Sequence, residues 1–246
     1  MAVSIIIPTW NEAACLGRTL NGLQGLNPAP REIVLVDGGS GDRTLAIARA
    51  WADRLPLRVL QAPAAGRAVQ MNWGASTARG DVLCFLHADT LVPDDLVPLV
   101  EGTLANPSVA GGGFVSLMSG PHQTRWGISL HNALKTYYAP LLFRPHLFVR
   151  GLRLLFGDQV MFCRRADFLA CGGFDPALPI MEEADLCLKL CRRGRLRQLS
   201  RVVQSSDRRV AAWGTLKANA IYLMIGVLWG IGVPATTLKR FYEEVR

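Results

Sequence analysis

Two short polar clusters in the sequence carry side chains that could do chemistry together. The first is HAD at positions 87–89, which follows the apolar run VLCFL. Side chains two positions apart on a strand lie on the same face, so His87 and Asp89 are expected to point into one site. The second is EEAD at positions 182–185, with three acids in four positions. Capping of a helix N-terminus needs fewer acids, so a carboxylate there is a candidate general base.

The elements that must position these clusters are short strands alternating with helices. Continuous apolar runs, typical of strands buried on both faces, alternate with segments of helical period. Strands are predicted at 4–7, 32–37, 57–61, 81–87 and 111–120, and helices at 11–23, 42–55, 66–80 and 181–194. This alternation predicts an α/β protein with a mainly parallel sheet and helices on both faces. Ligands bind such sheets beyond the carboxyl ends of the strands.

Polar residues follow three of the predicted strands at the ends where a ligand would bind. These residues form the sequences PTWNE, DGGSGD and HADT. Taken singly, residues such as Asn11 and Asp42 are explained by helix capping. Three polar ends that converge by topology favour one ligand site instead. That site would collect Asn11, Glu12, Asp37, His87 and Asp89.

Two common nucleotide-binding motifs are absent from the sequence. The loop GGSGDRT carries Thr44 where the third glycine of the dinucleotide fingerprint would stand. No Walker lysine follows a glycine-rich loop. A nucleotide at this site would therefore be held in another way.

The chain of 246 residues is basic, with 27 Lys and Arg against 19 Asp and Glu. A formal net charge of +8 favours anionic partners such as phosphates or an acidic membrane face. The Arg-rich stretch 192–201 lacks the interleaved aromatic residues that single-stranded nucleic acid binding favours, so no nucleic acid partner is expected. Six scattered cysteines without a C-x-x-C pair are expected to be reduced thiols. The N-terminal sequence does not resemble a signal peptide, which predicts a cytoplasmic location.

Five ordered motifs over roughly residues 3–195 resemble those of the family 2 inverting glycosyltransferases, which have the GT-A fold. The motifs are SIIIPTWNE, EIVLVDGGSGDRT, FLHADT, GGFD and MEEADLCLKLCRRG. More narrowly, the HAD triplet, the GDQ at 157–159 and the compact length resemble a small bacterial subfamily that is linked in part to arsenosugar biosynthesis. The resemblance implies a GT-A, Rossmann-like sheet, mixed but mainly parallel, together with a nucleotide-diphosphate sugar as donor and a divalent cation.

The resemblance also implies roles for residues on the donor side, with a UDP-sugar as the favoured donor. The first-strand motif would wrap the nucleoside, Asp37 would contact the base or ribose, and Arg67 would approach the base or diphosphate. Asp89 would ligate the metal, with His87 as a second ligand, a hydrogen-bond donor or a turn residue without a ligand. Because imidazole suits Mn²⁺ better than Mg²⁺, Mn²⁺ is the favoured cation. The predicted nucleotide-sugar-binding residues are Pro8, Thr9, Asn11, Glu12, Asp37, Arg67, His87 and Asp89.

On the acceptor side the resemblance assigns the general base to Glu183, although the family has aspartate at that position. Glu182 and Asp185 complete the predicted catalytic cluster. The processive Q-x-x-R-W signature is missing, so one non-processive transfer to a hydroxyl of a small or lipid-linked acceptor is expected. The predicted acceptor-binding residues are Asp158, Gln159, Arg208, Arg209 and Trp213, with helix capping as the alternative for the first two.

Two other classes of protein remain open at this point. A nucleotidyltransferase of similar fold would also use a metal and a central aspartate. It would usually carry a Gly-rich first loop with a Lys or Arg, whereas this first loop is PTWNE. A catalytically weak member that binds a membrane or a partner would keep the fold and tolerate the departures at His87 and Glu183.

The C-terminal sequence predicts a separate helical segment, with residues 1–210 as the GT-A domain and 211–246 following it. Residues 218–238 carry no charge and are about long enough to span a membrane. Gly230 and Gly232 before Pro234 instead predict two helices, the second amphipathic with Leu238, Phe241 and Val245 on one face. A hairpin over 216–246 is therefore favoured, in peripheral contact with the inner face of the cell membrane or in a homodimer, and a true span is the alternative.

Overall fold

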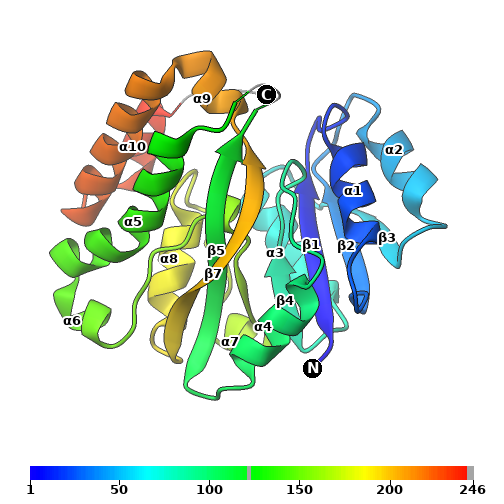
Figure 1. The fold of residues 1–246 in the computed structure, drawn as a ribbon, viewed down its shortest axis with the longest axis horizontal. Helices are drawn as coiled ribbons and strands as arrows, with labels where there is room; N and C mark the ends of the chain where they lie inside the picture. The colour runs from blue at the N-terminus through cyan, green and yellow to red at the C-terminus, as the bar shows by residue number, and fades with distance from the viewer. Residues whose placement is uncertain (121–122, 243–246) are drawn as a thin grey trace.

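A seven-stranded sheet forms the centre of the computed structural model, which describes residues 1–120 and 123–242 (Figure 1). The strand order is β3-β2-β1-β4-β6-β5-β7. The strands are β1 (Val3–Thr9), β2 (Glu32–Asp37), β3 (Leu57–Gln61), β4 (Val82–Phe85), β5 (Val109–Ser119), β6 (Phe162–Arg164) and β7 (Arg195–Ser206). The predicted class, a mixed and mainly parallel sheet with helices around it, is confirmed.

The parallel half of the sheet brings the ends of four strands to one edge. β1 runs parallel to β2 and β4, and β2 runs parallel to β3. Thr9 pairs with Asp37, and Ile6 pairs with Phe85. The polar loops that follow β1, β2 and β4 therefore start at the same edge. β6 is antiparallel to both β4 and β5, and β7 is parallel to β5.

Two helical layers cover the sheet because its strands are apolar on both faces. The first layer packs against Ile5, Ile7 and Ile33 and consists of α1 (Leu16–Gln24), α2 (Thr44–Trp51) and α4 (Leu96–Leu104). The second layer packs against Ile6, Val34 and neighbouring residues. It consists of α3 (Arg67–Thr77), α5 (Trp126–Phe143), α6 (Pro145–Val149), α7 (Arg165–Ala170), α8 (Glu182–Leu190), α10 (Thr215–Gly230) and α11 (Ala235–Leu238). Figure 1 shows α5, α6 and α10 at one end of the molecule and α1 and α2 at the other.

Two strand predictions need correction. β4 ends at Phe85, so His87 and Asp89 lie in the turn after the strand and not on one strand face. The stretch 192–201, interpreted only as a basic surface, contains the start of β7. Arg195 and Arg197 are exposed and flank Leu196, which is buried in the core. β7 is an edge strand with charged side chains on its outer face, and these made the alternation of apolar and polar residues difficult to recognise in the sequence.

The predicted break in the C-terminal sequence is confirmed. α10 ends at Gly230, Gly232 has a φ of +98°, and α11 begins directly after Pro234. A 3₁₀ turn at Lys239–Phe241 follows, while the predicted position of Val245 lies outside the described residues. In the part of the chain that the structure describes, no helix combines the length and the apolar character needed to cross a membrane. The helix α9 (Arg208–Trp213) runs across the predicted domain boundary at residue 210.

Candidate active site

A cavity of about 650 Å³ opens beyond the carboxyl ends of β1 and β4. This volume is typical of sites for small molecules and cofactors. The cavity is walled by the loops after β1 and β4, the first turns of α3 and α8, the segment 156–158, and side chains from α5, α9 and α10. Eleven of the predicted site residues line it: Pro8, Thr9, Glu12, Arg67, His87, Asp89, Asp158, Glu182, Glu183, Arg208 and Arg209.

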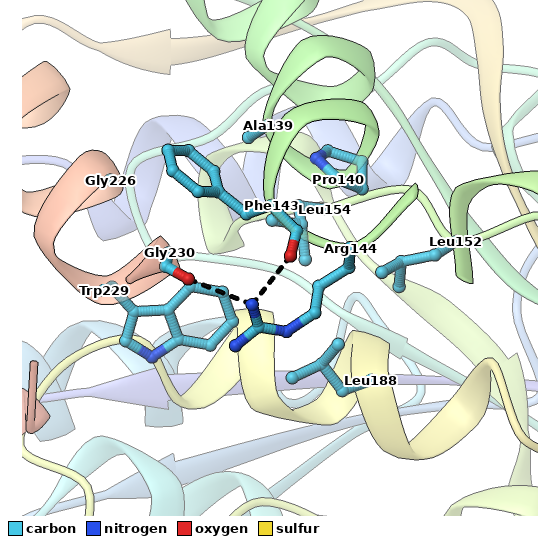
Figure 2. A pocket seen from close by; sticks show the side chains of 10 residues that line it. All are labelled: Ala139, Pro140, Phe143, Arg144, Leu152, Leu154, Leu188, Gly226, Trp229 and Gly230. Carbon is cyan, nitrogen blue, oxygen red and sulfur yellow. Dashed lines mark hydrogen bonds between the residues drawn. The ribbon is translucent and has the colours of Figure 1, made fainter. Parts of the chain in front are cut away.

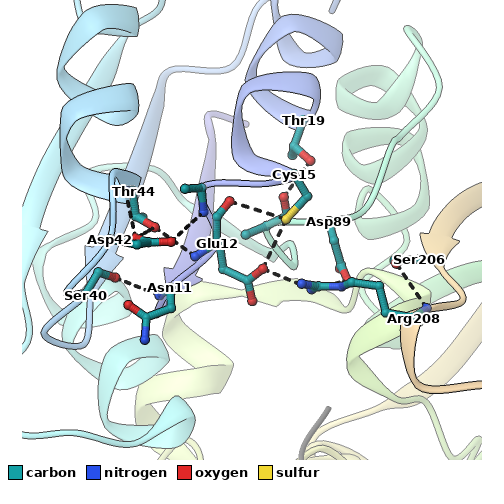
Figure 3. A network of polar contacts seen from close by, with 12 residues as sticks. Asn11, Glu12, Cys15, Thr19, Ser40, Asp42, Thr44, Asp89, Ser206 and Arg208 are labelled. Carbon is teal, nitrogen blue, oxygen red and sulfur yellow. Dashed lines mark hydrogen bonds and ion pairs between the residues drawn. The ribbon is translucent and has the colours of Figure 1, made fainter. Parts of the chain in front are cut away.

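Arg208 joins the loops after β1 and β4 at one side of the cavity. Its Nη2 atom lies 2.8 Å from Asp89 Oδ2 and 3.0 Å from Glu12 Oε2 (Figure 3). Arg208 was predicted to bind the acceptor. The structure instead places its guanidinium at the carboxylate that was predicted to ligate a metal.

Two predicted nucleotide-binding residues hold the loop after β2. The buried carboxylate of Asp37 accepts hydrogen bonds from the backbone N–H groups of Gly39 and Ser40, each at 2.9 Å, and from the Ser40 hydroxyl. Asn11 Oδ1 accepts a hydrogen bond from the Gly41 N–H at 2.9 Å. Neither side chain lines the cavity, so their contact with a nucleoside stays a prediction.

Of the three acids at the start of α8, two line the cavity and one does not. Glu182 and Glu183 are buried and line the cavity, and Arg67 pairs with both. Its Nη2 atom lies 2.5 Å from Glu182 Oε1 and 3.2 Å from Glu183 Oε1. Asp185 points away from the cavity and pairs with Lys189 at 2.7 Å. Because Asp185 does not line the cavity, its place in the catalytic cluster stays a prediction that this geometry does not support.

Glu183 has the properties of a base that works near neutral pH. Burial raises its pKa to about 7, and the neighbouring Glu182 acts in the same direction. The positive charge of Arg67 opposes this rise. A carboxylate poised near pH 7 matches the pKa that efficient proton abstraction requires.

His87 lies on the floor of the cavity in its neutral form. Burial lowers its pKa to about 4, and the nearby Arg67 acts in the same direction. Its Nε2 atom is buried without a hydrogen-bond partner in the described structure. Gly157 covers this nitrogen, because a Cβ at that glycine would lie 2.2 Å from His87 Nε2 and 2.8 Å from Glu183 Oε1.

The side chains of the cavity that could ligate a metal ion fit only one kind of divalent cation site. Among residues 1–120 and 123–242, no group of three or more His, Cys, Asp or Glu side chains could hold a metal ion. Asp89 offers one carboxylate, and His87 offers a neutral imidazole whose Nε2 atom is covered. Such a set fits a cation that takes most of its ligands from the phosphates of a substrate, as Mg²⁺ commonly does. Arg208 would then release Asp89.

Among the residues that the structure describes, three that are not glycine have positive φ angles, and each lies in or within two residues of the cavity lining. They are Asn11 at 56°, Val160 at 51° and Met181 at 67°. Such a conformation is a genuine outlier for a β-branched valine. Val160 follows the 157–159 turn, and Met181 directly precedes Glu182. Backbone strain concentrated in this way is characteristic of functional sites.

Two of the predicted acceptor-binding residues have structural roles. Gln159 is buried and holds the turn at 157–159, where its Oε1 accepts from the Phe156 N–H at 2.9 Å and its Nε2 donates to Thr136 at 3.0 Å. Trp213 packs edge-on against Tyr242, with ring centroids 5.9 Å apart. Neither lines the cavity, so contact of these two residues with an acceptor stays a prediction.

Lys135 is a functional candidate that the sequence did not reveal. Its ammonium group lies in the cavity, 3.9 Å from the centroid of the Phe156 ring and 3.3 Å from Asn132 Oδ1. Burial lowers its pKa, and no carboxylate of the described residues forms an ion pair with it. Asn132 also donates to Asp158 at 3.2 Å. The only sequence signal was the pair Asn132 and Lys135, three positions apart on one helix face.

The chain matches characterised proteins at the level of a family. Residues 4–171 match the profile of Glycosyl transferase family 2. The dolichol-phosphate mannosyltransferase of Pyrococcus furiosus is 36% identical over 113 residues, which cover 44% of this chain and 31% of that protein. The pre-mycofactocin glycosyltransferase of Mycobacterium tuberculosis is 27% identical over 226 residues, or 89% of this chain and 46% of that protein. The chain thus spans between about a quarter and a half of the length of such relatives.

Solved structures share the fold over nearly the whole chain. The mannosyltransferase PcManGT from Pyrobaculum calidifontis, in complex with GDP-Man and Mn²⁺, has a TM-score of 0.70 and 20% identity, covering 99% of this chain and 65% of that one. S. aureus TarS 1–349 in complex with UDP-GlcNAc has a TM-score of 0.65 and 16% identity, covering 98% and 70%. At these identities the likeness establishes the fold alone.

Proposed function

The chain belongs to glycosyl transferase family 2, and on this premise we propose that it moves one sugar from a nucleotide-diphosphate sugar to an acceptor hydroxyl with inversion. One observation carries the proposal. The buried carboxylate of Glu183, with its pKa raised to about 7, faces the same cavity as the cluster of Glu12, Asp89 and Arg208. Sugar transfer with inversion needs two parts: a base that accepts the proton of the acceptor hydroxyl, and charged groups that stabilise the leaving group.

The donor is assigned to the side of the cavity next to β1 and β4. Structural neighbours that hold UDP, UDP-GlcNAc and GDP-Man support a nucleotide-diphosphate sugar. Pro8, Thr9 and Glu12 from the loop after β1 line this side. The preference for a UDP-sugar stays a prediction, since the neighbours hold both uridine and guanosine nucleotides.

Asp89 would hold the divalent cation, with His87 beside it, and the neighbour that holds Mn²⁺ supports a requirement for such an ion. When bound, the cation neutralises charge that develops on the diphosphate as the sugar bond breaks. Arg208, which is a cation itself, would move from Asp89 to the phosphate oxygens. The preference for Mn²⁺ over Mg²⁺ stays a prediction.

Glu183 would accept the proton of the acceptor hydroxyl. The hydroxyl oxygen then forms a bond to the anomeric carbon, and the bond from that carbon to the diphosphate oxygen breaks with its electron pair on the diphosphate. Attack from the face opposite to the leaving group inverts the anomeric centre. Arg67 would hold Glu182 and Glu183 in place through its contacts at 2.5 and 3.2 Å.

The acceptor would enter beside Lys135, Asp158 and Arg209, which line the cavity on the side of α5 and α9. A single transfer is proposed because the processive signature is absent. The link to arsenosugar biosynthesis, the division at residue 210 and a cytoplasmic or peripheral location stay predictions. The family match sets aside the alternative of a nucleotidyltransferase.

The test is a panel of UDP-, GDP- and dTDP-sugars incubated with the protein and Mn²⁺, with release of the nucleoside diphosphate as the readout. We expect release from one nucleotide class, and loss of that release in Glu183→Gln. The anomeric configuration of the product, read by NMR, should be opposite to that of the donor. Retention of configuration, or equal release by Glu183→Gln, would refute the mechanism.

A further inference from the structure

The outer face of α5 carries a stripe of large apolar side chains in contact with solvent. Trp126, Leu130, Leu134, Tyr137 and Leu141 follow one another at intervals of three or four residues, so they lie on one side of the helix. Trp126 is 71% exposed and Leu130 is 61% exposed. The opposite side of α5 is already buried in the protein through Ile128, Thr136 and Ala139. The stripe is therefore not part of the core.

The neighbouring helix α10 is apolar around its whole circumference but lies at the surface. Between Thr215 and Gly230 it carries one charged residue, Lys217, yet buries only Ala218, Ile225 and Gly230. Leu216 is 87% exposed, and Leu223 and Val227 are also exposed. A helix that is apolar on all sides is normally buried in a protein or a membrane.

The two helices pack side by side and present their exposed faces together. His131 of α5 contacts Asn219 of α10 at 3.1 Å. At their C-terminal ends, Arg144 donates to the Gly230 carbonyl at 3.0 Å, and the Phe143 ring packs against Gly230 (Figure 2). Ile128 and Ala218 share one buried cluster, and Ala139 and Ile225 share another. Because both helices turn these faces inward, their exposed faces lie on the outer side of the pair.

The charged side chains of the helices that form this surface are all basic. The helices α5 and α10 contain no Asp or Glu. The basic side chains Arg150, Lys217 and Arg240 are exposed. A second copy of the chain would bring the same positive charges against this face, because a two-fold interface pairs identical surfaces. An anionic lipid surface would instead attract each of these side chains.

We propose that the outer face of α5 and α10 docks on an anionic lipid bilayer, with the helices parallel to its surface. Apolar side chains enter the headgroup region while the basic residues contact lipid phosphates. The inner faces of the same helices line the cavity, through Lys135 of α5 and Tyr222 of α10. Docking would bring the cavity close to the bilayer surface, where a lipid-linked acceptor is within reach. This surface adds α5 to the C-terminal segment, residues 216–246, that the sequence analysis predicted to contact a membrane.

The test is sedimentation of the full chain with vesicles of phosphatidylcholine alone or mixed with phosphatidylglycerol. We expect binding to the anionic vesicles, a loss of roughly tenfold or more in Leu134→Glu/Leu141→Glu, and weaker binding in high salt. Leu169→Glu is the matched control, since Leu169 and Leu141 are both 48% exposed and Leu169 lies on α7. Arg150→Glu/Lys217→Glu should remove the preference for anionic lipid without changing the melting temperature.

Two results would overturn the proposal. Binding that is unchanged in the α5 variant, or lost equally in Leu169→Glu, would show that this face is not the docking surface. A wild-type dimer that becomes a monomer in Leu134→Glu/Leu141→Glu, with no vesicle binding by either, would assign the face to self-association. Neither readout involves sugar transfer, so failure here is distinguishable from failure of the proposed function.

Discussion

Arg208 Nη2 lies 2.8 Å from Asp89 Oδ2, so a cation from the C-terminal part of the chain neutralises the carboxylate after β4. The same nitrogen lies 3.0 Å from Glu12 Oε2 (Figure 3). A divalent cation at Asp89 must therefore compete with a guanidinium that is already in place. On the proposed function, binding of metal and diphosphate would be coupled to a movement of Arg208.

We expect Arg208→Ala to bind Mn²⁺ more tightly in the absence of nucleotide, because Asp89 is then unpaired. The gain should be about fivefold, which corresponds to the roughly 1 kcal/mol that a partly exposed ion pair contributes. Binding of the nucleoside diphosphate should weaken in the same variant. Titration of Mn²⁺ followed by electron paramagnetic resonance measures the first effect, and calorimetry measures the second.

Arg201→Ala is a suitable control because Arg201 pairs with Asp95 at 2.6 Å, outside the cavity lining. It should change neither affinity. Asp89→Ala should lose both metal-dependent nucleotide binding and transfer, whereas His87→Ala should lose less. Full transfer by the wild-type protein in excess chelator would contradict a role for any metal.

Glu183→Gln should lower the rate of transfer by roughly two or more orders of magnitude, as removal of a general base does. Binding of the donor should persist, because the substitution keeps the shape of the side chain. Asp185→Asn is the matched control, since Asp185 pairs with Lys189 at 2.7 Å and does not line the cavity. Steady-state rates and donor affinities of both variants decide the assignment. A larger loss in Asp185→Asn would move the base to that residue.

The positions of the strand ends could be predicted from the sequence, but the contacts among the side chains could not. Apolar runs ending in PTWNE, DGGSGD and HADT were sufficient to bring Glu12, His87 and Asp89 to one cavity. Strand topology fixes these positions, and it can be read from local patterns. The pairing of Arg208 with Asp89 joins residues 119 positions apart, and no local pattern encodes it.

The same distinction explains which features were missed and which assignments the geometry does not support. Lys135 reaches the cavity only because α5 packs beside the segment that contains Phe156, a contact that depends on the whole fold. Gln159 was assigned to the acceptor because it is polar and next to Asp158, but its side chain turns inward to Thr136. The strand β7 escaped notice because arginines occupy its outward positions and interrupt the apolar period.

The rate of transfer should depend on the ionisation of Glu183. Burial raises its pKa to about 7, and a base acts only in its deprotonated form. The rate should therefore fall about tenfold for each pH unit below 7 and level off above it. A profile of kcat/KM against pH measures this, because it reports the pKa of the free enzyme, and the inflection should vanish in the residual activity of Glu183→Gln. An inflection near the usual carboxyl value of 4.5 would contradict the assignment.

The raised pKa of Glu183 also predicts that the protein loses stability as the pH rises. The folded protein binds the Glu183 proton more tightly than the unfolded chain does, since burial raises the pKa from 4.5 to about 7. The resulting stabilisation is complete below about pH 4.5 and is lost as the pH rises through about 7. Thermal unfolding should therefore show Glu183→Gln gaining stability relative to the wild type between these values, and keeping the gain at higher pH.

Gly157 should be required for activity because it leaves space between His87 and Glu183. Its backbone does not have a positive φ, so conformational freedom is not the reason for a glycine here. A Cβ at this position would lie 2.2 Å from His87 Nε2 and 2.8 Å from Glu183 Oε1, and both distances are far inside normal contact. Gly157→Ala must displace the imidazole, the base or the turn at 157–159. A displacement of about 1 Å at a reacting group can lower a rate about a hundredfold, and this is the loss we expect.

Gly102→Ala is the matched control for this substitution. Gly102 lies within α4, and a Cβ there would meet no atom within 4 Å. This change should leave transfer unaffected and stabilise the protein by roughly 0.5–1 kcal/mol, since alanine favours a helix over glycine. Gly157→Ala should instead cost about 1–3 kcal/mol, as overpacking of a filled site does, while the fold persists. Transfer rates and thermal unfolding of both variants are the measurement. Normal transfer by Gly157→Ala would show that the contact between His87 and the 157–159 turn is not part of the catalytic arrangement.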